Sequence, residues 1–517
     1  MAKYIFVTGG VVSSLGKGVT ASALGRLLKN RGLKVFMQKF DPYINVDPGL
    51  MDPCEHGEVF VTDDGAETDL DLGHYERFID EPVSQNSSIT TGRVYSNVIK
   101  REREGGYGGA TVQVIPHITD EIKSKLIAAA TDSGADIVIT EIGGTVGDIE
   151  GLPFLEAIRQ ARLDFGYKNT LYVHNTLVPY LKAASEIKTK PTQRSVKDLL
   201  SLGIQPDVVV LRTEVEIEDS VKAKISHFCN VGKEAVIEAR DVEVLYEVPI
   251  RLQEQGLDDI ILDHFRMDAP CADMTSWNSL IDTVKNLNGE IKIGIIGDYS
   301  ILPDAYFSIN EALRHAGYAF DKRVKISFID ADAVKENTAH QLSHLDGILL
   351  AYGEENKAME GKLATVKYAR ENAIPFFGIC QGMQLMATEY GKNVAKMSND
   401  DFTTPLPQEA VNKDGEWQTG LFEIKLQANS KIASIYEQTV VAERHRHRFV
   451  LNTVHQTALE AAGLIFTGTS TTFNLVEAVE LANHPFFIGV QFYPQFLSRP
   501  QKPHPLFKEF IQAAIRK

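Results

Sequence analysis

A lysine between two glycines, near the start of the chain, is the first pattern with recognisable chemistry. Residues 6–18 read FVTGGVVSSLGKG, and Leu24, Leu27 and Leu28 follow at helical spacing. A strand, a glycine-rich turn and a helix together point backbone N–H groups and the helix N-terminus at phosphates, which the lysine neutralises. Gly18 replaces the Ser or Thr that usually follows the lysine of a Walker A loop. The pattern predicts a nucleoside triphosphate site, and the alternative is a tight turn that contains a lysine.

Carboxylates for a metal ion come from two places. Residues 63–76 are dense in acids, and Glu141 ends the apolar run 136–142 just before two glycines. Magnesium bound to a nucleotide takes one or two carboxylates besides phosphate oxygens and water. We predict Asp71 and Glu141 as the magnesium ligands. A solvated acidic loop is the alternative for the first stretch.

A second cationic group of residues follows later in the chain. Residues 188–194 read KTKPTQR, and Lys224 lies on the next expected helix. Three cationic side chains with Thr and Gln donors suit a second triphosphate, although such loops are often only solvated. Lys39 follows an expected strand at 34–38, and ligands of open α/β sheets gather at the carboxyl ends of strands. Two phosphate sites with a lysine each would suit phosphoryl transfer between two nucleotides.

A cysteine stands between two glycines after an expected strand at 375–379. Residues 378–382 read GICQG, the arrangement of a nucleophile elbow, which exposes the side chain of its central residue. The N-terminus of the following helix would lower the thiol pKa of Cys380. The alternative is a buried structural cysteine.

Alternating strands and helices must position these residues. The first half alternates in this way, the pattern loosens around 263–288, and a second alternation starts at 291 with strands at 324–329, 347–350 and 375–379. Alternation of this kind predicts a parallel sheet covered on both faces. We therefore predict an α/β protein with two domains, each a doubly wound, mainly parallel sheet. The expected boundaries are 1–267, a linker at 268–290, and 291–517.

Composition excludes several classes of protein. The 517 residues are 44% hydrophobic and 24% charged, as in soluble globular proteins. No apolar run approaches the roughly 20 residues of a membrane span, and the N-terminus lacks the apolar region of a signal peptide. The four cysteines show no metal-ligand spacing, and the net charge of −16 argues against a protein that coats nucleic acid. We expect a cytoplasmic protein with no membrane or nucleic-acid partner.

These residues together resemble the CTP synthase family, whose members join an amidoligase (synthetase) domain to a class I glutamine amidotransferase domain. The resemblance covers nearly the whole chain. It is densest at 4–18, 39–47 and 56–80, and residues 65–77, GAETDLDLGHYER, are far more specific than a phosphate loop alone.

The resemblance implies ATP-dependent amination of UTP at C4. The γ-phosphate of ATP would first move to the uracil O4, and ammonia would then displace phosphate. It implies Mg²⁺ as cofactor, CTP as feedback inhibitor, GTP as activator, and a homotetramer that can assemble into filaments.

The resemblance also implies roles for matched residues. Lys17 and Lys39 would support the phosphoryl group that is transferred. The residues implied for ATP are Ser14, Leu15, Gly16, Lys17, Gly18, Val19, Asp71, Arg240, Asp241 and Val242. Those implied for UTP and CTP are Ser13, Asp148, Ile149, Glu150, Lys188, Thr189, Lys190, Pro191, Thr192, Gln193 and Lys224. Those implied for glutamine are Gly353, Gln381, Gly382, Met383, Gln384 and Arg448.

The chain departs from the family pattern in the amidotransferase half. The family expects a histidine and a glutamate near the C-terminus, and Tyr493 and Gln495 stand at these positions. A tyrosine with a pKa of about 10 is a poor base at neutral pH, and an amide cannot stabilise an imidazolium as a carboxylate does. The oxyanion stretch reads AYGEE at 351–355, so only Gly353 is retained and two acids adjoin it. The glutamine-contacting glutamate is shifted to Asp401.

The sequence interpretation is therefore a CTP synthase with an intact synthetase half and a weak or absent glutaminase, which uses free ammonia or ammonia from another protein. Three alternatives stay open. A rearranged base such as His445, His447 or His484 would keep glutamine hydrolysis. A non-catalytic nucleotide-binding or filament subunit would regulate a true CTP synthase. A related amidoligase would act on a different acceptor.

Overall fold

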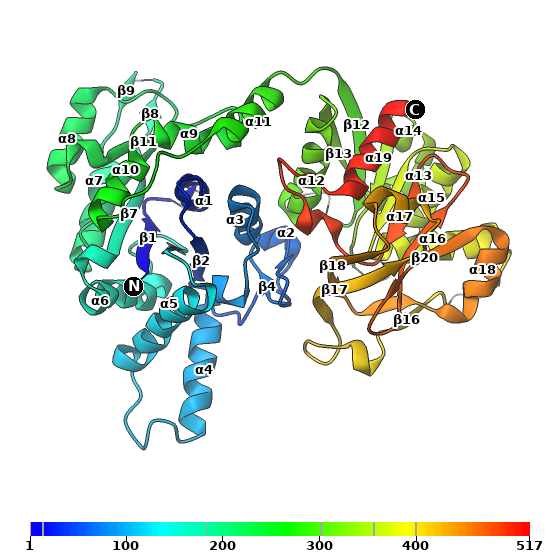
Figure 1. The fold of residues 1–517 in the computed structure, drawn as a ribbon, viewed down its shortest axis with the longest axis horizontal. Coiled ribbons are helices and arrows are strands. Elements are labelled where there is room, and N and C mark those ends of the chain that lie inside the picture. Colours follow the sequence, from blue (N-terminus) through cyan, green and yellow to red (C-terminus); the bar gives the residue numbers. More distant parts are fainter. Residues whose placement is uncertain (1, 13–14, 184, 300–301, 355–356, 399–400) are drawn as a thin grey trace. The chain divides into compact units, whose positions relative to one another are not determined.

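Two compact units make up the chain (Figure 1). The computed structural model describes residues 2–12, 15–183, 185–299, 302–354, 357–398 and 401–517. Unit 1 comprises residues 1–48 and 74–281, and unit 2 comprises residues 49–73 and 282–517. Helices α3 (Asp71–Ile79) and α11 (Thr275–Lys285) cross the two divisions.

Unit 1 is built on a fully parallel sheet with the strand order β11-β10-β7-β1-β6-β2-β5. Every residue of β6 is buried, as expected where helices cover both faces of a parallel sheet. The other elements of this unit besides α3 and α11 are β1 (Lys3–Gly9), α1 (Lys17–Asn30), β2 (Val35–Asp41), β5 (Ser88–Thr90), α4 (Thr91–Arg103), α5 (Thr119–Ser133), β6 (Ile137–Ile142), α6 (Leu152–Phe165), β7 (Thr170–Leu177), β8 (Tyr180–Leu181), β9 (Glu186–Ile187), α7 (Lys190–Ser201), β10 (Val208–Thr213), α8 (Asp219–Cys229), β11 (Val236–Arg240), α9 (Val248–Gln253) and α10 (Leu257–Phe265).

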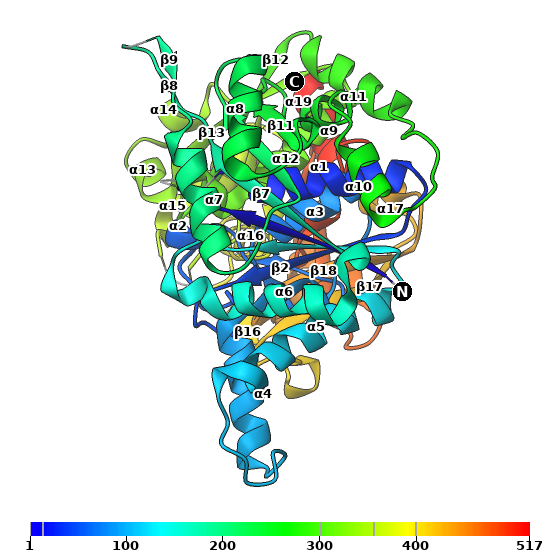
Figure 2. The same ribbon diagram turned by 90° about the vertical axis from the view of Figure 1, so that its left-hand side faces the viewer.

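Helices pack on both faces of the unit 1 sheet. The main core joins Phe6 and Val138 of the sheet to apolar residues of α4, α5 and α6, while α1, α9 and α10 cover the opposite face (Figure 1). Figure 2 shows α4 extending away from the sheet, as Figure 1 also does. Only part of α4 belongs to the core, because Val94 and Val98 are buried while Ile99 is exposed.

A helix stands inside the segment predicted to be a linker. In α11, Trp277, Leu280 and Ile281 are buried at helical spacing, and the indole Nε1 of Trp277 donates to the backbone oxygen of Tyr246 at 2.7 Å. The polar residues and the proline around this helix concealed its short apolar face. The boundaries at 267 and 291 stay a prediction.

Unit 2 holds a larger sheet with the order β13-β12-β14-β15-β22-β21-β20-β17-β18. Its strands pair in parallel from β13 to β22 and antiparallel from β22 to β18. Its elements are α2 (Pro53–His56), β3 (Phe60–Val61), β4 (Glu67–Thr68), β12 (Glu290–Gly297), α12 (Phe307–Tyr318), β13 (Arg323–Asp330), α13 (Ala331–Glu336), α14 (Thr338–Leu342), β14 (Gly347–Leu350), α15 (Met359–Glu371), β15 (Phe376–Ile379), α16 (Gln381–Asn393), β16 (Thr403–Pro405), β17 (Gln418–Leu426), α17 (Lys431–Tyr436), β18 (Val440–His447), β19 (Phe449–Leu451), α18 (Gln456–Ala462), β20 (Leu464–Ser470), β21 (Val476–Leu481), β22 (Phe487–Val490) and α19 (Pro505–Arg516).

The predicted α/β class with two sheet domains is confirmed. The continuous apolar runs identified the strands because parallel strands are buried on both faces. The antiparallel strands that extend the second sheet were not foreseen. Within the described residues, no helix is long and apolar enough to cross a membrane.

Residues 49–73 pack within unit 2, whereas the residues that precede and follow them belong to unit 1. Asp63 accepts from the Nε of Arg444 at 2.6 Å, and Glu67 accepts from the Nε of Arg446 at 2.7 Å. Both arginines belong to β18. Two acids of the stretch that suggested metal ligands are therefore paired with arginines of this unit.

Candidate functional site

The predicted phosphate loop lies at the carboxyl edge of the unit 1 sheet. Gly16 precedes α1 with a left-handed φ of +86°, and Lys17 is the first residue of the helix. The Nζ of Lys17 donates to the backbone oxygen of Gly144, in the loop after β6. Leu15 and Gly18 are buried and Val19 is half-buried. Ser13 and Ser14, also predicted here, lie outside the described residues.

Lys39 and Glu141 are cross-strand neighbours on β2 and β6. Both are almost fully buried. Lys39 forms an ion pair with Asp41 at 3.4 Å, and the hydroxyl of Tyr75 donates to the Glu141 carboxylate. The structure thus brings together a cation and carboxylates at the strand ends, where ligands of open α/β sheets gather.

Asp71 is the first residue of α3 and is half-buried. Its backbone N–H donates to the carboxylate of Asp69 at 3.1 Å. Because Asp71 is grouped with unit 2 and Glu141 with unit 1, their joint role as magnesium ligands stays a prediction.

The segment predicted to bind the pyrimidine nucleotide leads from β9 into α7. Lys188 pairs with Glu186 at 2.5 Å, and the amide of Gln193 donates to the hydroxyl of Thr189 at 3.0 Å. Thr189 and Thr192 are buried. Lys190 is exposed and starts α7 with Pro191 beside it, and the exposed Lys224 lies on α8, which packs against α7. The cationic ends of the segment are accessible while its hydroxyls are anchored.

The residues predicted near adenine follow β11. Arg240 and Asp241 are exposed and Val242 is half-buried. The Nε of Arg212 lies 3.1 Å from the carboxylate of Asp241, and a guanidinium nitrogen of Arg212 lies 3.0 Å from where a Cβ on Gly16 would be. Arg212 therefore connects this turn to the phosphate loop.

The residues predicted to contact CTP lie in the loop between β6 and α6. Asp148, Ile149 and Glu150 are all exposed, and Ile149 has an exposed fraction of 83%. The same loop is fixed to the phosphate loop, because Val146 N–H donates to the Gly9 oxygen at 2.9 Å.

Unit 2 contains a cavity of about 960 Å³ that reaches Cys380. Its wall carries aromatic and basic side chains and also part of the segment 49–73. The lining residues include Leu50, Met51, Val59, Tyr299, Tyr352, Gly353, Lys392, Trp417, Arg446, His447, Arg448, Phe449 and Tyr493.

Cys380 occupies the elbow between β15 and α16, as predicted, with φ 54° and ψ −107°. The flanking glycines allow this turn, because a Cβ on Gly382 would lie 2.3 Å from the Leu350 oxygen. The predicted drop in thiol pKa is wrong. Burial raises the pKa of Cys380 to about 11, although hydrogen bonds from the Tyr493 hydroxyl and the Gln381 N–H oppose the rise. Desolvation of the thiolate outweighs the helix N-terminus here.

Tyr493 lies against this thiol in a buried position. Burial and the neighbouring Cys380 raise the Tyr493 pKa well above 10, so the phenol holds its proton. Its ring contacts Tyr352 and stacks on Phe496. Gln495 is also buried, and neither atom of its amide has a hydrogen-bond partner among the described residues. The pair offers no proton acceptor for the thiol.

A buried ion pair, which the sequence interpretation missed, occupies the region beside Gly353. The backbone N–H of Glu354 donates to Asp298 at 2.7 Å, and the Nζ of Lys362 lies 2.7 Å from the same carboxylate oxygen. Lys362 also donates to the side-chain oxygen of Gln381 at 2.9 Å. A developing oxyanion would therefore meet a carboxylate that already holds this N–H.

Among the described residues, the acid that opposes an oxyanion is thus Asp298 and not Glu354, which the sequence suggested. The side chain of Glu354 pairs with exposed Lys357 at 2.9 Å, and Glu355 lies outside the described residues. No local signal marked Asp298, since its partners Glu354 and Lys362 are distant in sequence.

Of the predicted glutamine-contacting residues, Gly353, Gln381, Gln384 and Arg448 line the cavity, and Gly382 and Met383 do not. Gln381, Gly382, Met383 and Gln384 form the first turn of α16. Gln384 donates to Gln491, and the amide of Gln491 lies 3.6 Å from the sulfur of Cys380. Arg448 stacks near Trp417 and Phe449 and lies 3.5 Å from Glu416. The shifted acid Asp401 accepts from His455 at 2.9 Å.

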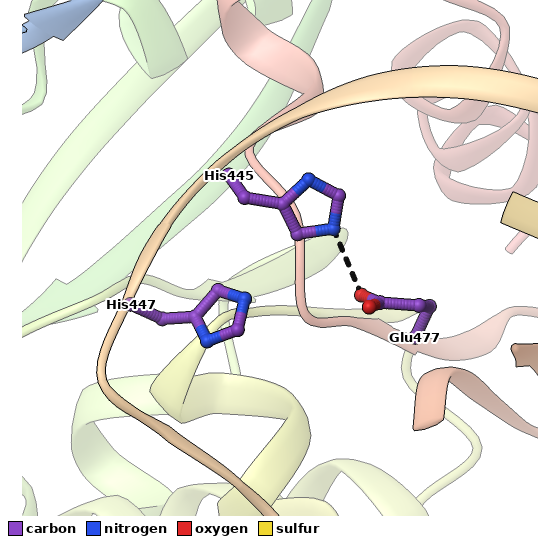
Figure 3. A group of neighbouring side chains, drawn as sticks. All are labelled: His445, His447 and Glu477. Atoms are coloured by element: carbon purple, nitrogen blue, oxygen red, sulfur yellow. Dashed lines mark hydrogen bonds and ion pairs between the residues drawn. The ribbon is translucent and has the colours of Figure 1, made fainter. Parts of the chain in front are cut away.

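The three histidines named as substitute bases have different surroundings. Figure 3 shows His445 and His447 on β18 facing Glu477 of β21. The Nε2 of His445 lies 2.9 Å from Glu477 and its Nδ1 lies 3.0 Å from the Glu443 backbone oxygen. Both ring nitrogens are thus engaged by acceptors. His484 lies near the Ala369 oxygen at 3.3 Å and packs on Phe487.

His447 is the one of these three that lines the cavity. Burial and the neighbouring His445 lower its pKa well below 6.5, so it is a weak base. The ligand atoms of His445, His447 and Glu477 lie within 4.8 Å of one another. A tetrahedral zinc would hold such atoms about 3.3 Å apart, so the 2.9 Å separation of His445 and Glu477 is a hydrogen bond.

Two family models and full-length relatives match this chain. A family model described as the CTP synthase N-terminus matches residues 3–267, and a class I glutamine amidotransferase model matches residues 301–513. The CTP synthase of Halalkalibacterium halodurans is 56% identical over 529 residues, covering 100% of this chain and 99% of that protein. The CTP synthase of Bacillus licheniformis is 56% identical over 530 residues with the same coverage.

A solved structure of the Trypanosoma brucei CTPS glutaminase domain with bound acivicin also matches. It is 31% identical, covers 44% of this chain and 94% of its own, and has a TM-score of 0.41. The two family models and the full-length relatives decide the classification: the chain belongs to the CTP synthase family.

Proposed function

We propose that this protein makes CTP from UTP, ATP and ammonia and that it hydrolyses glutamine weakly or not at all. The γ-phosphoryl group of ATP moves to the uracil O4, and ammonia then displaces phosphate at C4. The products are CTP, ADP and inorganic phosphate. Full-length similarity to CTP synthases supports the ligase reaction.

The edge of the unit 1 sheet supplies the groups for phosphoryl transfer. Lys17, at the start of α1, holds the ATP phosphates together with residues 15–19, and Lys39 stabilises charge on the group in transfer. Residues 240–242 border the adenine. Glu141 and Asp71 are the acids proposed to hold Mg²⁺, which neutralises phosphate charge when bound. The buried carboxylate of Glu141, oriented by Tyr75, fits that ion.

The segment 188–193 and Lys224 hold the triphosphate of UTP, and CTP uses the same segment as feedback inhibitor. The exposed residues 148–150 contact the end of CTP that differs from UTP. A homotetramer, a cytoplasmic location and activation by GTP are further parts of this proposal, and family membership supports them.

One observation carries the preference for ammonia. The phenol of Tyr493 lies where a base must accept the Cys380 proton, and both groups keep their protons because burial raises both pKa values. Only a thiolate attacks an amide efficiently. The carboxylate of Asp298 on the Glu354 N–H adds a second obstacle. His447 on the cavity wall is the observation that keeps a rearranged base as the second candidate.

The test measures CTP from UTP, ATP and MgCl₂ with either ammonium chloride or glutamine. We expect turnover with ammonia and at least about 100-fold less with glutamine, given how steeply loss of triad residues lowers rates. Lys17→Ala serves as the inactive control for nucleotide chemistry.

Other outcomes choose among the alternatives. Glutamine-dependent turnover that Cys380→Ala abolishes would establish a rearranged base. No turnover with either nitrogen source would favour a regulatory nucleotide-binding subunit. Turnover with an acceptor other than UTP would identify a different amidoligase.

A further inference from the structure

Three consecutive side chains of β7 form a polar bridge under the nucleotide edge of unit 1. His174, Asn175 and Thr176 are buried and lie at the carboxyl half of the strand, which pairs with β1 on one side and β10 on the other. Each side chain hydrogen-bonds an element that leads to a nucleotide-binding segment. Buried polar groups are costly unless bonded, so such a network fixes the elements that it joins.

His174 joins β1 to α7. Its Nδ1 lies 2.8 Å from the hydroxyl of Thr8, and its Nε2 lies 2.7 Å from the hydroxyl of Ser195. Burial, with the nearby Lys17, lowers the His174 pKa to about 3, so the ring is neutral. A neutral imidazole has one donor and one acceptor. One hydroxyl must therefore donate to the ring while the other accepts, which gives the chain of bonds a direction.

The phosphate loop rests directly on this network. A Cβ on Gly10 would lie 1.9 Å from the hydroxyl of Ser195, so the loop backbone is in close contact with that group. The N–H of Gly10 donates to the backbone oxygen of Asn175 at 3.2 Å. The amide of Asn175 donates to Thr20 on α1 at 2.8 Å.

The other end of the bridge reaches the first turn of α7. The hydroxyl of Thr176 donates to the hydroxyl of Thr192 at 2.9 Å, and Thr192 donates to the Leu177 oxygen at 3.0 Å. The helix that carries Thr192 begins at Lys190, so the anchored turn adjoins the proposed pyrimidine triphosphate segment.

We propose that His174, through Thr8 and Ser195, is a positioning residue that couples the ATP phosphate loop to the pyrimidine triphosphate segment. The assignment of the two segments rests on the proposed function. Phosphoryl transfer requires the reacting atoms about 3–3.5 Å apart, so a fixed separation of the two loops favours it. Because the bridge joins the two segments, the nucleotide that binds one segment favours the arrangement that the other nucleotide requires, and we expect the two nucleotides to bind cooperatively.

The test compares UTP affinity with and without a non-hydrolysable ATP analogue, by calorimetry on the full chain with the oligomeric state followed by size exclusion. Thr8→Val removes the hydroxyl at nearly constant volume, and Thr8→Ser keeps it. Thr140→Val is the matched control, because Thr140 is buried in β6 of the same sheet and donates to Gln38 at 3.1 Å without joining the two segments.

We expect the analogue to tighten UTP binding in the unaltered chain. Thr8→Val should reduce the ratio of UTP affinities with and without the analogue at least about 3-fold, and it should leave UTP affinity without the analogue unchanged within 2-fold. Thr8→Ser and Thr140→Val should retain the ratio of the unaltered chain. Ser195→Ala should behave as Thr8→Val. The proposal would be overturned if the analogue changed UTP affinity equally in the unaltered chain and in Thr8→Val. It would also be overturned if the analogue had no effect on UTP affinity in the unaltered chain. Absence of CTP formation with coupling intact would instead count against the proposed function alone.

Discussion

The two units use the same backbone device at their candidate sites. In each, a helix starts directly after a residue with a positive φ. This residue is Gly16 in unit 1, seven residues beyond the end of β1, and Cys380 in unit 2, directly after β15. In unit 1 that helix begins with a half-buried lysine among other charged strand ends. In unit 2 that helix begins beside the protonated thiol of Cys380 and the buried ion pair of Lys362 and Asp298.

The difference lies in what surrounds the helix N-terminus. Around α1, Lys17, Lys39 and Glu141 keep charges at the sheet edge. Around α16, Lys362 and Asp298 have side chains with no exposed surface and neutralise each other. An anion beside α16 would also need N–H groups from outside the helix that are free to donate, and in unit 2 the Glu354 N–H is already bonded to Asp298. The same kind of helix start therefore stands in two different electrostatic surroundings.

The largest effect should come from the charge in unit 1. Lys17→Ala should lower ammonia-dependent CTP turnover about 100- to 1,000-fold, because a preorganised cation is lost from the phosphates. Lys29→Ala, on the same helix with a partly exposed partner Glu81, is the control and should change turnover less than 2-fold. Steady-state kinetics with ammonium chloride measure both. Comparable losses in the two variants would contradict a specific role for Lys17.

Loss of the buried ion pair between Lys362 and Asp298 in unit 2 should have the next largest effect, on the free energy of unfolding. Lys362→Met leaves the Asp298 carboxylate buried with only the Glu354 N–H, so unfolding free energy should fall by about 3 kcal/mol, at the low end of such losses. Lys357→Ala removes a surface pair and should cost less than about 0.5 kcal/mol. Denaturation followed by a unit 2 fluorescence signal compares them. Equal stabilities would mean that water already screens Asp298.

The thiol of Cys380 should react slowly with iodoacetamide. With a pKa of about 11 against an ordinary 9, the thiolate fraction at pH 7 is about 100-fold lower than in the unfolded chain. Alkylation measured by mass spectrometry should rise about 10-fold per pH unit between pH 8 and 10. A fast reaction at pH 7 with an inflection between pH 6 and 7 would reveal an imidazole partner.

The same shift makes a stability prediction with a definite sign. A thiol whose pKa is raised on folding favours the folded state while it is protonated, so the contribution is complete below about pH 9 and disappears as pH rises through about 11. Cys380→Ala should remove this part of the alkaline decline.

Restoration of the missing triad residues should have the smallest effect. Tyr493→His with Gln495→Glu supplies a base and its orienting carboxylate, yet glutamine hydrolysis should rise less than about 10-fold while Asp298 holds the Glu354 N–H. Addition of Asp298→Ala with Lys362→Met frees that N–H without leaving a lone buried charge and should raise hydrolysis further. Full glutaminase activity from Tyr493→His with Gln495→Glu alone would show that substrate displaces the Asp298 carboxylate from the Glu354 N–H.

Sequence patterns predicted what depends on local order. The strands around Phe6 and Val138 are continuous apolar runs, and the elbow at Cys380 is fixed by its neighbouring glycines. Lys17 likewise stands at the start of a helix because Gly16 directly before it adopts the left-handed turn. These features need only residues that are close along the chain.

Sequence patterns failed where distant residues decide. The pKa of Cys380 depends on burial under Tyr493, which lies more than a hundred positions later, and the helix N-terminus alone suggested the opposite direction. Asp298 meets Lys362 and Glu354 through tertiary packing. The apolar face of α11 consists of so few residues that the surrounding polar residues masked it.

The packing of the segment 49–73 limits how the two halves of the chain can be exchanged by recombination. A family model for the N-terminal region includes this segment, yet its acids Asp63 and Glu67 are bound to Arg444 and Arg446 in unit 2. A recombination event that exchanged the C-terminal half at residue 267 would give Asp63 and Glu67 new partners and would build the cavity wall from two different proteins. The two halves are consequently not independently exchangeable. Substitutions in the segment 49–73 constrain those accepted in the C-terminal half, and the reverse also holds.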